Sequence, residues 1–294
     1  MKHKKRTLGD WVFDIFNYLL MIVIAFTTLY PFLHVFFSSF SDSTKLVEHT
    51  GLMLRPAGFS LAGYRAVFQN ADIYIGYGNT IFYVVVGTVL STFLTALFAY
   101  PLSHKRLKYG SFLNKMVVVT MFFSAGMIPL YIIVRNLHLL NTRWSTILPG
   151  AISAYNVLIM KTAYMGVPDS LEESARLDGA NEFQSFIRII LPNVKANIAV
   201  MVLFYGVGIW NSWFSALLYI TDRNKYPLQL FLREILISSS SKEMGNYAVT
   251  SETAFLDEVI KHATTVVATV PILMIYPFIQ KYFIKGAMIG AVKE

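Results

Sequence analysis

The residues best suited to act on another molecule are concentrated in one polar segment, Pro168 to Pro192, which holds five of the 17 acidic residues. Long apolar stretches flank this segment on both sides. The segment also contains a helix start, a glycine break, a second amphipathic pattern and a closing proline. An ordered polar segment between apolar stretches predicts a surface that binds a partner in water.

Motifs that carry catalysis are missing from the sequence. There is no glycine-rich phosphate loop of the form G-x-x-x-x-G-K-[ST], so we expect the chain itself to bind no nucleotide. Hydrolysis has no support, because neither an H-E-x-x-H helix nor a G-x-S-x-G turn occurs. The absence of cysteine excludes disulfides and thiolate metal sites. We therefore predict no catalytic residue, no metal and no cofactor in this chain.

The spacing within Pro168–Pro192 predicts two short helices. Asp169 or Ser170 can cap the first, since each has a glutamate three residues later, the spacing of a capping box. Gly179 fits a left-handed turn after it, because glycine has no Cβ to clash. A second helix is predicted over 181–190, where apolar residues recur at i, i+3, i+4 and i+7: Phe183, Phe186, Ile187 and Ile190. On pattern alone, the alternative is an amphipathic hairpin that lies on lipid headgroups.

Composition places the chain in a membrane. Hydrophobic residues make up 55% and charged residues 14%, whereas about a quarter of the residues in a soluble domain are charged. The net charge of +8 suggests nucleic acid at first sight. However, the basic residues are spread through connecting segments and form no face at helical spacing, so we expect no nucleic-acid partner.

Six stretches are long and apolar enough to cross a bilayer as helices, which takes roughly 20 residues each. Each is expected to be helical, because backbone groups find no water partner in lipid. The predicted spans are about 15–40, 73–103, 116–134, 144–160, 196–221 and 263–280. They form a transmembrane domain over 15–282, between an N-terminal segment, 1–14, and a tail, 283–294.

Lysine and arginine are unevenly distributed among the segments that connect these spans. Fifteen of the 25 fall in the two ends, the loop after the second span and the region around 168–192. The bias is strongest in short segments, where the positive-inside rule applies best. We therefore expect both termini and the 168–192 segment in the cytoplasm. The N-terminal apolar run is too long for a signal peptide and lacks a small-x-small cleavage site, so we expect an uncleaved anchor.

Two segments predicted on the outer side are substantial, 41–72 and 222–257. In the second, Leu228, Phe231, Leu232 and Ile235 have helical spacing, which predicts an amphipathic helix over 227–237. Such a helix can lie on the bilayer interface, cap a pore or meet an external partner. The serine-rich stretch that follows, 238–247, is predicted to be a loop.

The residues of 168–192 resemble the EAA motif of ABC-importer permease subunits, written E-A-A-x-x-D-G-A-x(5)-F-x-x-I-x-L-P. The match runs from Glu173 to Pro192, and Ser174 replaces the middle alanine. Other strings, such as LYPF at 29–32, ALFAYPLS at 96–103 and KGAMIGAVK at 285–293, are similar to those of the carbohydrate-importer, maltose-type branch. Within that branch the chain looks closest to permeases for complex or acidic oligosaccharides. The resemblance covers essentially the whole chain.

The resemblance implies an all-α integral membrane protein with the type I ABC importer permease fold, six spans and a cytoplasmic coupling hairpin at 168–192. In the family, this hairpin docks in a cleft of a separate ATPase, whose closure drives alternating access. The chain would be no enzyme, since ATP and Mg²⁺ bind in the partner ATPase. The implied partners are a second permease subunit in a heterodimer, an ABC ATPase dimer, an extracytoplasmic solute-binding protein, membrane lipid and a saccharide substrate.

Residue by residue, the resemblance implies that Glu173 pairs with a basic group of the ATPase and that Gly179 lets the chain turn into the cleft. Ala175 and Ala180 would permit close approach. Aromatic side chains of the second helix would act as anchors. The predicted coupling residues are Glu172, Glu173, Ala175, Asp178, Gly179, Ala180, Phe183, Phe186 and Arg188.

The substrate path is predicted to lie between this subunit and a partner, because six helices alone make a thin wall. Aromatic faces stack on sugar rings, and amides hydrogen-bond their hydroxyls. The candidates of these types are Asn79, Tyr205, Trp210, Asn211 and Trp213. For each, helix packing or an interfacial aromatic belt is the alternative role.

Two other classes of protein fit parts of the pattern. An ion-coupled secondary carrier would need charges at the middle of the spans or broken-helix repeats, and the span centres carry no formal charge. A non-transport membrane scaffold would use the 168–192 segment to hold a cytosolic protein. Co-purification with an ATPase and ATP-dependent uptake would separate the importer from both.

Overall fold

The computed structural model of the protein describes residues 8–244 and 251–291. In these residues the backbone forms helices and loops, with one isolated β-bridge between Ser41 and Phe59. Helices are expected for apolar segments in lipid, because each backbone amide then bonds within its own segment. The prediction of an all-α chain is confirmed. The chain divides into two compact units, residues 1–70 with 234–269 and residues 71–233 with 270–294.

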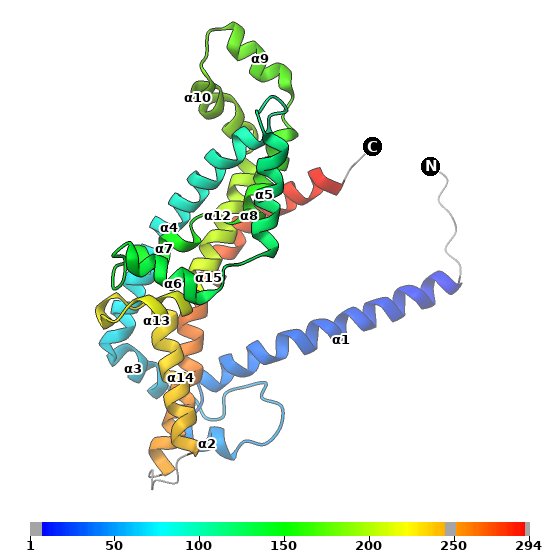
Figure 1. Ribbon diagram of the computed structural model, residues 1–294. Helices are drawn as coiled ribbons and strands as arrows, with labels where there is room; N and C mark the ends of the chain where they lie inside the picture. Colours follow the sequence, from blue (N-terminus) through cyan, green and yellow to red (C-terminus); the bar gives the residue numbers. More distant parts are fainter. Residues whose placement is uncertain (1–7, 245–250, 292–294) are drawn as a thin grey trace. The chain divides into compact units, whose positions relative to one another are not determined.

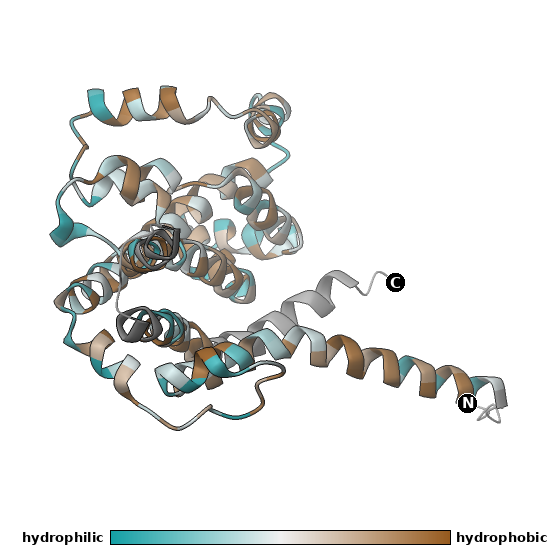
Figure 2. Cartoon of the chain, turned by 90° about the horizontal axis from the view of Figure 1, so that it is seen from below, coloured by the Kyte–Doolittle hydropathy of each residue, from teal (hydrophilic) through white to brown (hydrophobic). Residues whose placement is uncertain are grey.

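The first unit begins with α1 (Leu8–Ser39), which contains Pro31. Apolar residues run along most of α1 (Figure 2), and their side chains are largely exposed, Phe13 at 67% for example. This is the pattern of a helix whose neighbours are lipid or another subunit. The short helices α2 (Ser43–Glu48) and α3 (Ala62–Gln69) follow. A Cβ added to Gly63 would lie 2.7 Å from Val259 Cγ1, so α3 packs directly on α15 (Ser251–Ala291).

The second unit is organised around α4 (Ala71–Ser103), which packs along α8 (Ala154–Met165) and α12 (Lys195–Trp210) (Figure 1). Small residues permit this close packing. At Gly87 an added Cβ would lie 2.7 Å from Ile209 Cδ1 of α12. The buried side chains that join these helices include Ala96, Ala99, Val157, Met160 and Met201.

Shorter helices complete the second unit. They are α5 (Gly110–Phe122), α6 (Met127–Asn136), α7 (Trp144–Ile147), η1 (Leu148–Gly150), α13 (Phe214–Tyr219) and η3 (Arg223–Lys225). The helix α14 (Leu228–Met244) begins in this unit. The second unit also contains the hairpin described below, which consists of α9 (Asp169–Leu177), α10 (Glu182–Ser185), η2 (Phe186–Ile190) and α11 (Leu191–Asn193).

Long apolar helices account for part of the predicted set of spans. Among the described residues, three helices are long and apolar enough to cross a membrane, Gly9–Ser39, Ala71–Ser103 and Leu256–Ile275. Two bent pairs raise the number to as many as five if each pair is one span. Several membrane-crossing helices are thus present, and the count of six stays a prediction.

The third and fourth predicted spans are not continuous helices. The third, 116–134, bends by 112° between α5 and α6. Gly126 lies at this break with φ +84°, a backbone conformation that glycine adopts without strain. The fourth, 144–160, is interrupted between α7 and α8, where Pro149 lacks the N–H that a continuing helix needs. Periodicity alone does not reveal either break.

The C-terminal part of the predicted fifth span and the serine-rich loop also differ from expectation. The helix α12 ends at Trp210, and α13 starts at Phe214, so 196–221 is not one helix. The predicted amphipathic helix over 227–237 is present as α14, but it continues to Met244. The prediction of a loop at 238–244 is therefore wrong. Serine has a moderate helix propensity, so these serines can extend a helix that has already formed. Residues 245–247 lie outside the described residues.

Candidate functional site

The hairpin, residues 168–193, begins with α9 (Asp169–Leu177). Pro168 occupies the N-cap position, so Asp169 and Ser170 lie inside the helix and do not cap it. The capping box predicted there is wrong for this reason. The helix ends in the predicted left-handed turn at Gly179, with φ +85°. Gly179 N donates to Arg176 O and Ala180 N donates to Ala175 O, which is the Schellman pattern.

A capping box occurs instead at the start of the second helix. The Asn181 side chain accepts from Gln184 N, and the Gln184 side chain accepts from Asn181 N, which fixes the start of α10 (Glu182–Ser185). The helix then widens into one π-helical turn, η2 (Phe186–Ile190), and ends with α11 (Leu191–Asn193). Isolated π turns are rare and occur often at functional sites. The predicted helix over 181–190 is thus confirmed as helical but changes type within its length.

The hairpin has an inner and an outer face. On the inner face Phe186 is 2% exposed, and its ring lies 4.8 Å from that of Tyr100. On the outer face Leu177 is 89% exposed and Phe183 58%. Of the predicted coupling residues, Glu173, Asp178, Gly179, Phe183 and Arg188 are exposed, Ala180 is half-buried, and Glu172, Ala175 and Phe186 are buried. Phe186 therefore packs inside this subunit, and Phe183 is the exposed aromatic side chain of the two.

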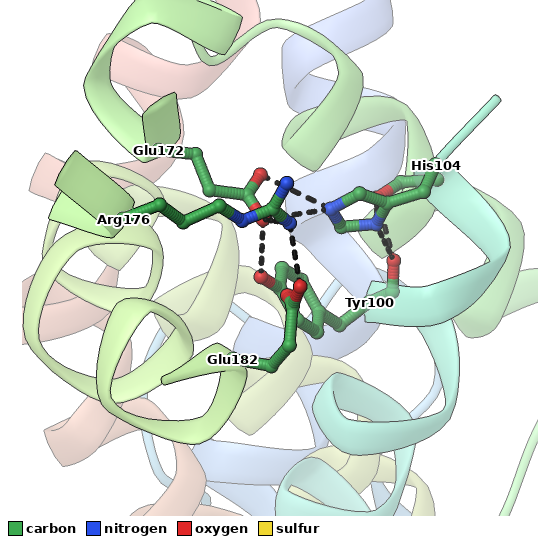
Figure 3. Close-up of polar contacts among 6 residues, drawn as sticks. Tyr100, His104, Glu172, Arg176 and Glu182 are labelled. Atoms are coloured by element: carbon green, nitrogen blue, oxygen red, sulfur yellow. Dashed lines mark hydrogen bonds and ion pairs between the residues drawn. The ribbon is translucent and has the colours of Figure 1, made fainter. Parts of the chain in front are cut away.

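Glu172 lies in a polar cluster that joins the hairpin to the end of α4 (Figure 3). The hydroxyl of Tyr100 donates to Glu172 Oε1 over 2.9 Å, and His104 Nε2 lies 3.0 Å from both carboxylate oxygens. Arg176 Nη2 donates to Glu172 Oε1 over 2.8 Å and to Glu182 Oε1 over 2.6 Å. The carboxylate of Glu172 thus has partners on α4, in the loop after it, and on α9.

The electrostatics of this cluster favour the ionised form of Glu172. Burial raises the pKa of its carboxyl, but hydrogen bonds from His104 and Tyr100 and the positive charge of Arg176 outweigh burial. The net effect lowers the pKa of Glu172 below its ordinary value. A buried charge with several donors is held in a fixed orientation.

A metal ion is not the best occupant of this cluster. Ligand atoms of His104, Glu172 and Glu182 lie within 4.8 Å of one another, which is close enough to hold a cation. The guanidinium of Arg176 already pairs with the carboxylates of Glu172 and Glu182, so it supplies the positive charge that a metal ion would bring. We therefore assign no metal to these residues.

Sequence reasoning missed Tyr100, His104 and Arg176 as parts of the site. Tyr100 and His104 are 72 and 68 residues away from Glu172. Glu172, Ala175 and Arg176 are spaced at i, i+3 and i+4, so the sequence predicts that they share one face of a helix. The sequence holds no signal that this face is covered by the end of α4.

The predicted substrate-path residues do not form one group. Asn79 is buried, and its amide donates to the backbone oxygens of Asn224 and Tyr226 and accepts from Arg143. Tyr205 is buried, with its hydroxyl 2.6 Å from that of Thr95.

The other three candidates have different surroundings. Trp210 is 7% exposed, and its indole N–H has no hydrogen-bond partner in the part of the chain that the structure describes. Trp213 is half-buried and carries Arg233 over its ring at 4.6 Å. The amide of Asn211 is exposed, and it donates to Val207 O in its own helix.

A cavity of about 460 Å³ lies near these residues in the second unit, but none of the five lines it. Its wall contains several hydroxyl groups and carries no formally charged side chain. The hydroxyl-bearing residues of the wall are Thr80, Tyr83, Ser91, Ser124, Thr146, Ser212, Ser215 and Tyr219. Trp210 instead lines a smaller, apolar cavity of about 310 Å³ with Thr88 and Gly206.

Comparisons with known proteins find relatives that match nearly the whole chain. The protein "Polygalacturonan/rhamnogalacturonan transport system permease protein YtcP" of Bacillus subtilis (strain 168) is 41% identical over 96% of this chain and 98% of its own. "Protein LplC" of the same organism is 42% identical over 98% of this chain and 97% of its own. The chain is thus similar to these proteins over their full length.

A solved structure shows the same fold. A chain of a bacterial ABC transporter involved in the import of the acidic polysaccharide alginate superposes with a TM-score of 0.85 at 29% identity. The match covers 96% of this chain and 100% of that chain. Residues 91–285, which include the hairpin, match the family described as "Binding-protein-dependent transport system inner membrane component". The chain belongs to this family and is the multi-pass membrane permease component of an ABC importer, whose ATPase is a separate subunit.

Proposed function

We propose that this permease imports an oligosaccharide or sugar derivative and is driven by an ABC ATPase dimer that docks on the outer face of the hairpin. The exposure of that face carries the proposal, since Leu177 is 89% exposed and Phe183 58%. The helices that carry them, α9 and α10, lie at the end of the second unit away from α13 (Figure 1). Large apolar side chains exposed beside charged ones are typical of a partner site.

The chemistry of the outer face fits a protein cleft. Glu173 is exposed and can form a charge-assisted pair with a basic group of the ATPase. Phe183 can fill a pocket as an aromatic anchor. Gly179 turns the chain sharply, and an added Cβ there would meet no atom of the described residues within 4 Å. The tip of the hairpin is therefore free to enter a cleft.

The remaining parts of the proposal concern partners and orientation. We assign the hairpin and both termini to the cytoplasm, ATP and Mg²⁺ to the ATPase, and the pore to a heterodimer with a second permease subunit. A solute-binding protein delivers the substrate from the outer side. The excess of lysine and arginine in the short segments near the hairpin supports this orientation.

For the substrate we propose a complex oligosaccharide, including acidic ones. The names of YtcP and of the alginate importer support this class. The cavity of about 460 Å³ offers hydroxyls from α4, α7 and the loop after α12, which can hydrogen-bond the hydroxyls of a sugar ring. Since its wall carries no formal charge, we expect any uronate carboxylate to be neutralised outside this cavity.

The test is uptake by proteoliposomes that contain this chain with its second permease, ATPase and binding protein. Gly179→Arg is expected to abolish uptake and ATPase association, because its bulk blocks docking. Gly179→Ala is the matched control, since it carries the same backbone strain at φ +85° without the bulk. Uptake by Gly179→Arg at the wild-type rate would show that the hairpin is not the docking site.

A further inference from the structure

We propose that Glu172 is a positioning residue that ties the docked hairpin to the end of α4, so that movement of the hairpin is passed to α4. This inference rests on the proposed docking of the ATPase. It gives the two adjacent glutamates separate roles: Glu173 faces the partner, and Glu172 faces this subunit. Both belong to the coupling residues predicted from the sequence, and that prediction does not make this distinction.

The link is made by side chains. The backbone of α9 lies mainly against η2 and α10. Glu172, at 7% exposure, reaches from α9 to the hydroxyl of Tyr100 on α4 and to the ring of His104 just after it. A buried carboxylate with donors from separate elements resists displacement, because every lost bond leaves a polar group without water.

His104 strengthens this link through both of its ring nitrogens. Nδ1 lies 2.9 Å from the backbone oxygen of Tyr100, and Nε2 lies 3.0 Å from the carboxylate of Glu172. The backbone oxygen of Tyr100 can only accept a hydrogen bond, and so can the ionised carboxylate of Glu172. The ring therefore donates to both only when each of its nitrogens carries a hydrogen. His104 and Arg176 thus both contact the same carboxylate, from different elements.

The link extends across the whole hairpin. Arg176 bonds Glu172 within α9 and Glu182 at the start of α10, so one guanidinium bridges the turn at Gly179. The ring of Phe186 packs against those of Tyr100 and Tyr164, with centroid distances of 4.8 and 6.3 Å, and the two tyrosine rings also contact each other. The two hairpin helices and the end of α4 therefore form one connected body, and α4 is the helix on which α8 and α12 pack. A displacement of the hairpin is therefore transmitted to α4 and, through the packing of α4, to α8 and α12.

The first experiment compares Glu172→Gln with Glu173→Gln in the reconstituted importer. Glu172→Gln keeps size and one acceptor for Tyr100, and Arg176 keeps Glu182. We expect this variant to retain the ATPase and ATP hydrolysis but to lower the uptake per ATP hydrolysed roughly tenfold, the factor for one hydrogen bond to a charged group. Glu173→Gln is expected to weaken association of the ATPase instead. Glu48→Gln, an exposed change in α2, serves as the control.

Two outcomes of this comparison would overturn the inference. One is uptake per ATP equal to wild type in Glu172→Gln. The other is loss of the ATPase from that variant, which would make Glu172 part of the docking surface. Failure of the docking proposal shows up separately, as full uptake by Gly179→Arg. If Glu172→Gln does not reach the membrane, Tyr100→Phe removes a single hydroxyl and carries the same test with a smaller expected loss.

A second experiment restores the link covalently. The chain has no cysteine, so His104→Cys with Glu172→Cys introduces its only two thiols. With cysteine-free partner subunits, the double variant is expected to be uncoupled, and a short bis-maleimide that joins the two thiols is expected to recover uptake per ATP. A cross-linked protein that stays uncoupled would contradict a positioning role, because the connection would then be present without its effect.

Discussion

Glu172 and Glu173 are neighbours in the sequence, but one is buried and the other exposed on α9. Glu172 is 7% exposed and accepts a hydrogen bond from Tyr100 of α4, whereas Glu173 is exposed. Successive residues of an α-helix are about 100° apart around the axis, so a helix at an edge buries one and exposes the next. The same distinction between inner and outer face applies to the two phenylalanines of the second helix.

Phe186→Ala and Phe183→Ala should have contrasting effects. Phe186 is 2% exposed, so its truncation should lower the free energy of unfolding by about 3–5 kcal/mol, the usual range for a buried aromatic. Phe183 is 58% exposed, so its truncation should leave stability nearly unchanged and weaken binding of the ATPase. Thermal unfolding in detergent and co-purification measure the two effects. Equal stability losses would contradict the assignment of the two faces.

Asn79→Ala should act on stability rather than on substrate binding. The change leaves the backbone oxygens of Asn224 and Tyr226 and the guanidinium of Arg143 without their partner, at a cost of about 1–3 kcal/mol. We expect a lower unfolding temperature and an unchanged KM for uptake. Asn211→Ala, at an exposed amide, is the matched control for stability. A raised KM with unchanged stability would instead place Asn79 on the substrate path.

The stabilising effect of the Glu172 charge should depend on pH. The pKa of Glu172 is lowered in the folded protein, so its contribution to stability is present above the ordinary glutamate pKa and is lost as pH falls through the folded value. The difference in unfolding temperature between wild type and Glu172→Gln should therefore be constant near neutral pH and shrink below about pH 4. Glu173→Gln should show little difference throughout, since an exposed carboxylate contributes little. A gap for Glu172→Gln that widens in acid would show the opposite linkage.

The sequence by itself determined the class of protein, the hairpin and its turn. Apolar stretches near 20 residues long require helices in lipid, because the backbone has no other partner there. The turn at Gly179 could be predicted from the sequence, because a left-handed backbone conformation is unfavourable for residues that have a Cβ. The match from Glu173 to Pro192 pointed to the family, and the comparisons show it.

Only the tertiary structure decided which side of each element is covered. Periodicity marks a helical face but does not say what lies against it, so Glu172 and Phe186 were grouped with the docking residues. Their partner Tyr100 is 72 residues away from Glu172 in the sequence. No local sequence pattern indicates a contact across that separation. The breaks near Gly126 and Pro149 were hidden in the same way, since a bent apolar segment has the same composition as a straight one. Long-range packing, which no local pattern contains, decided these features.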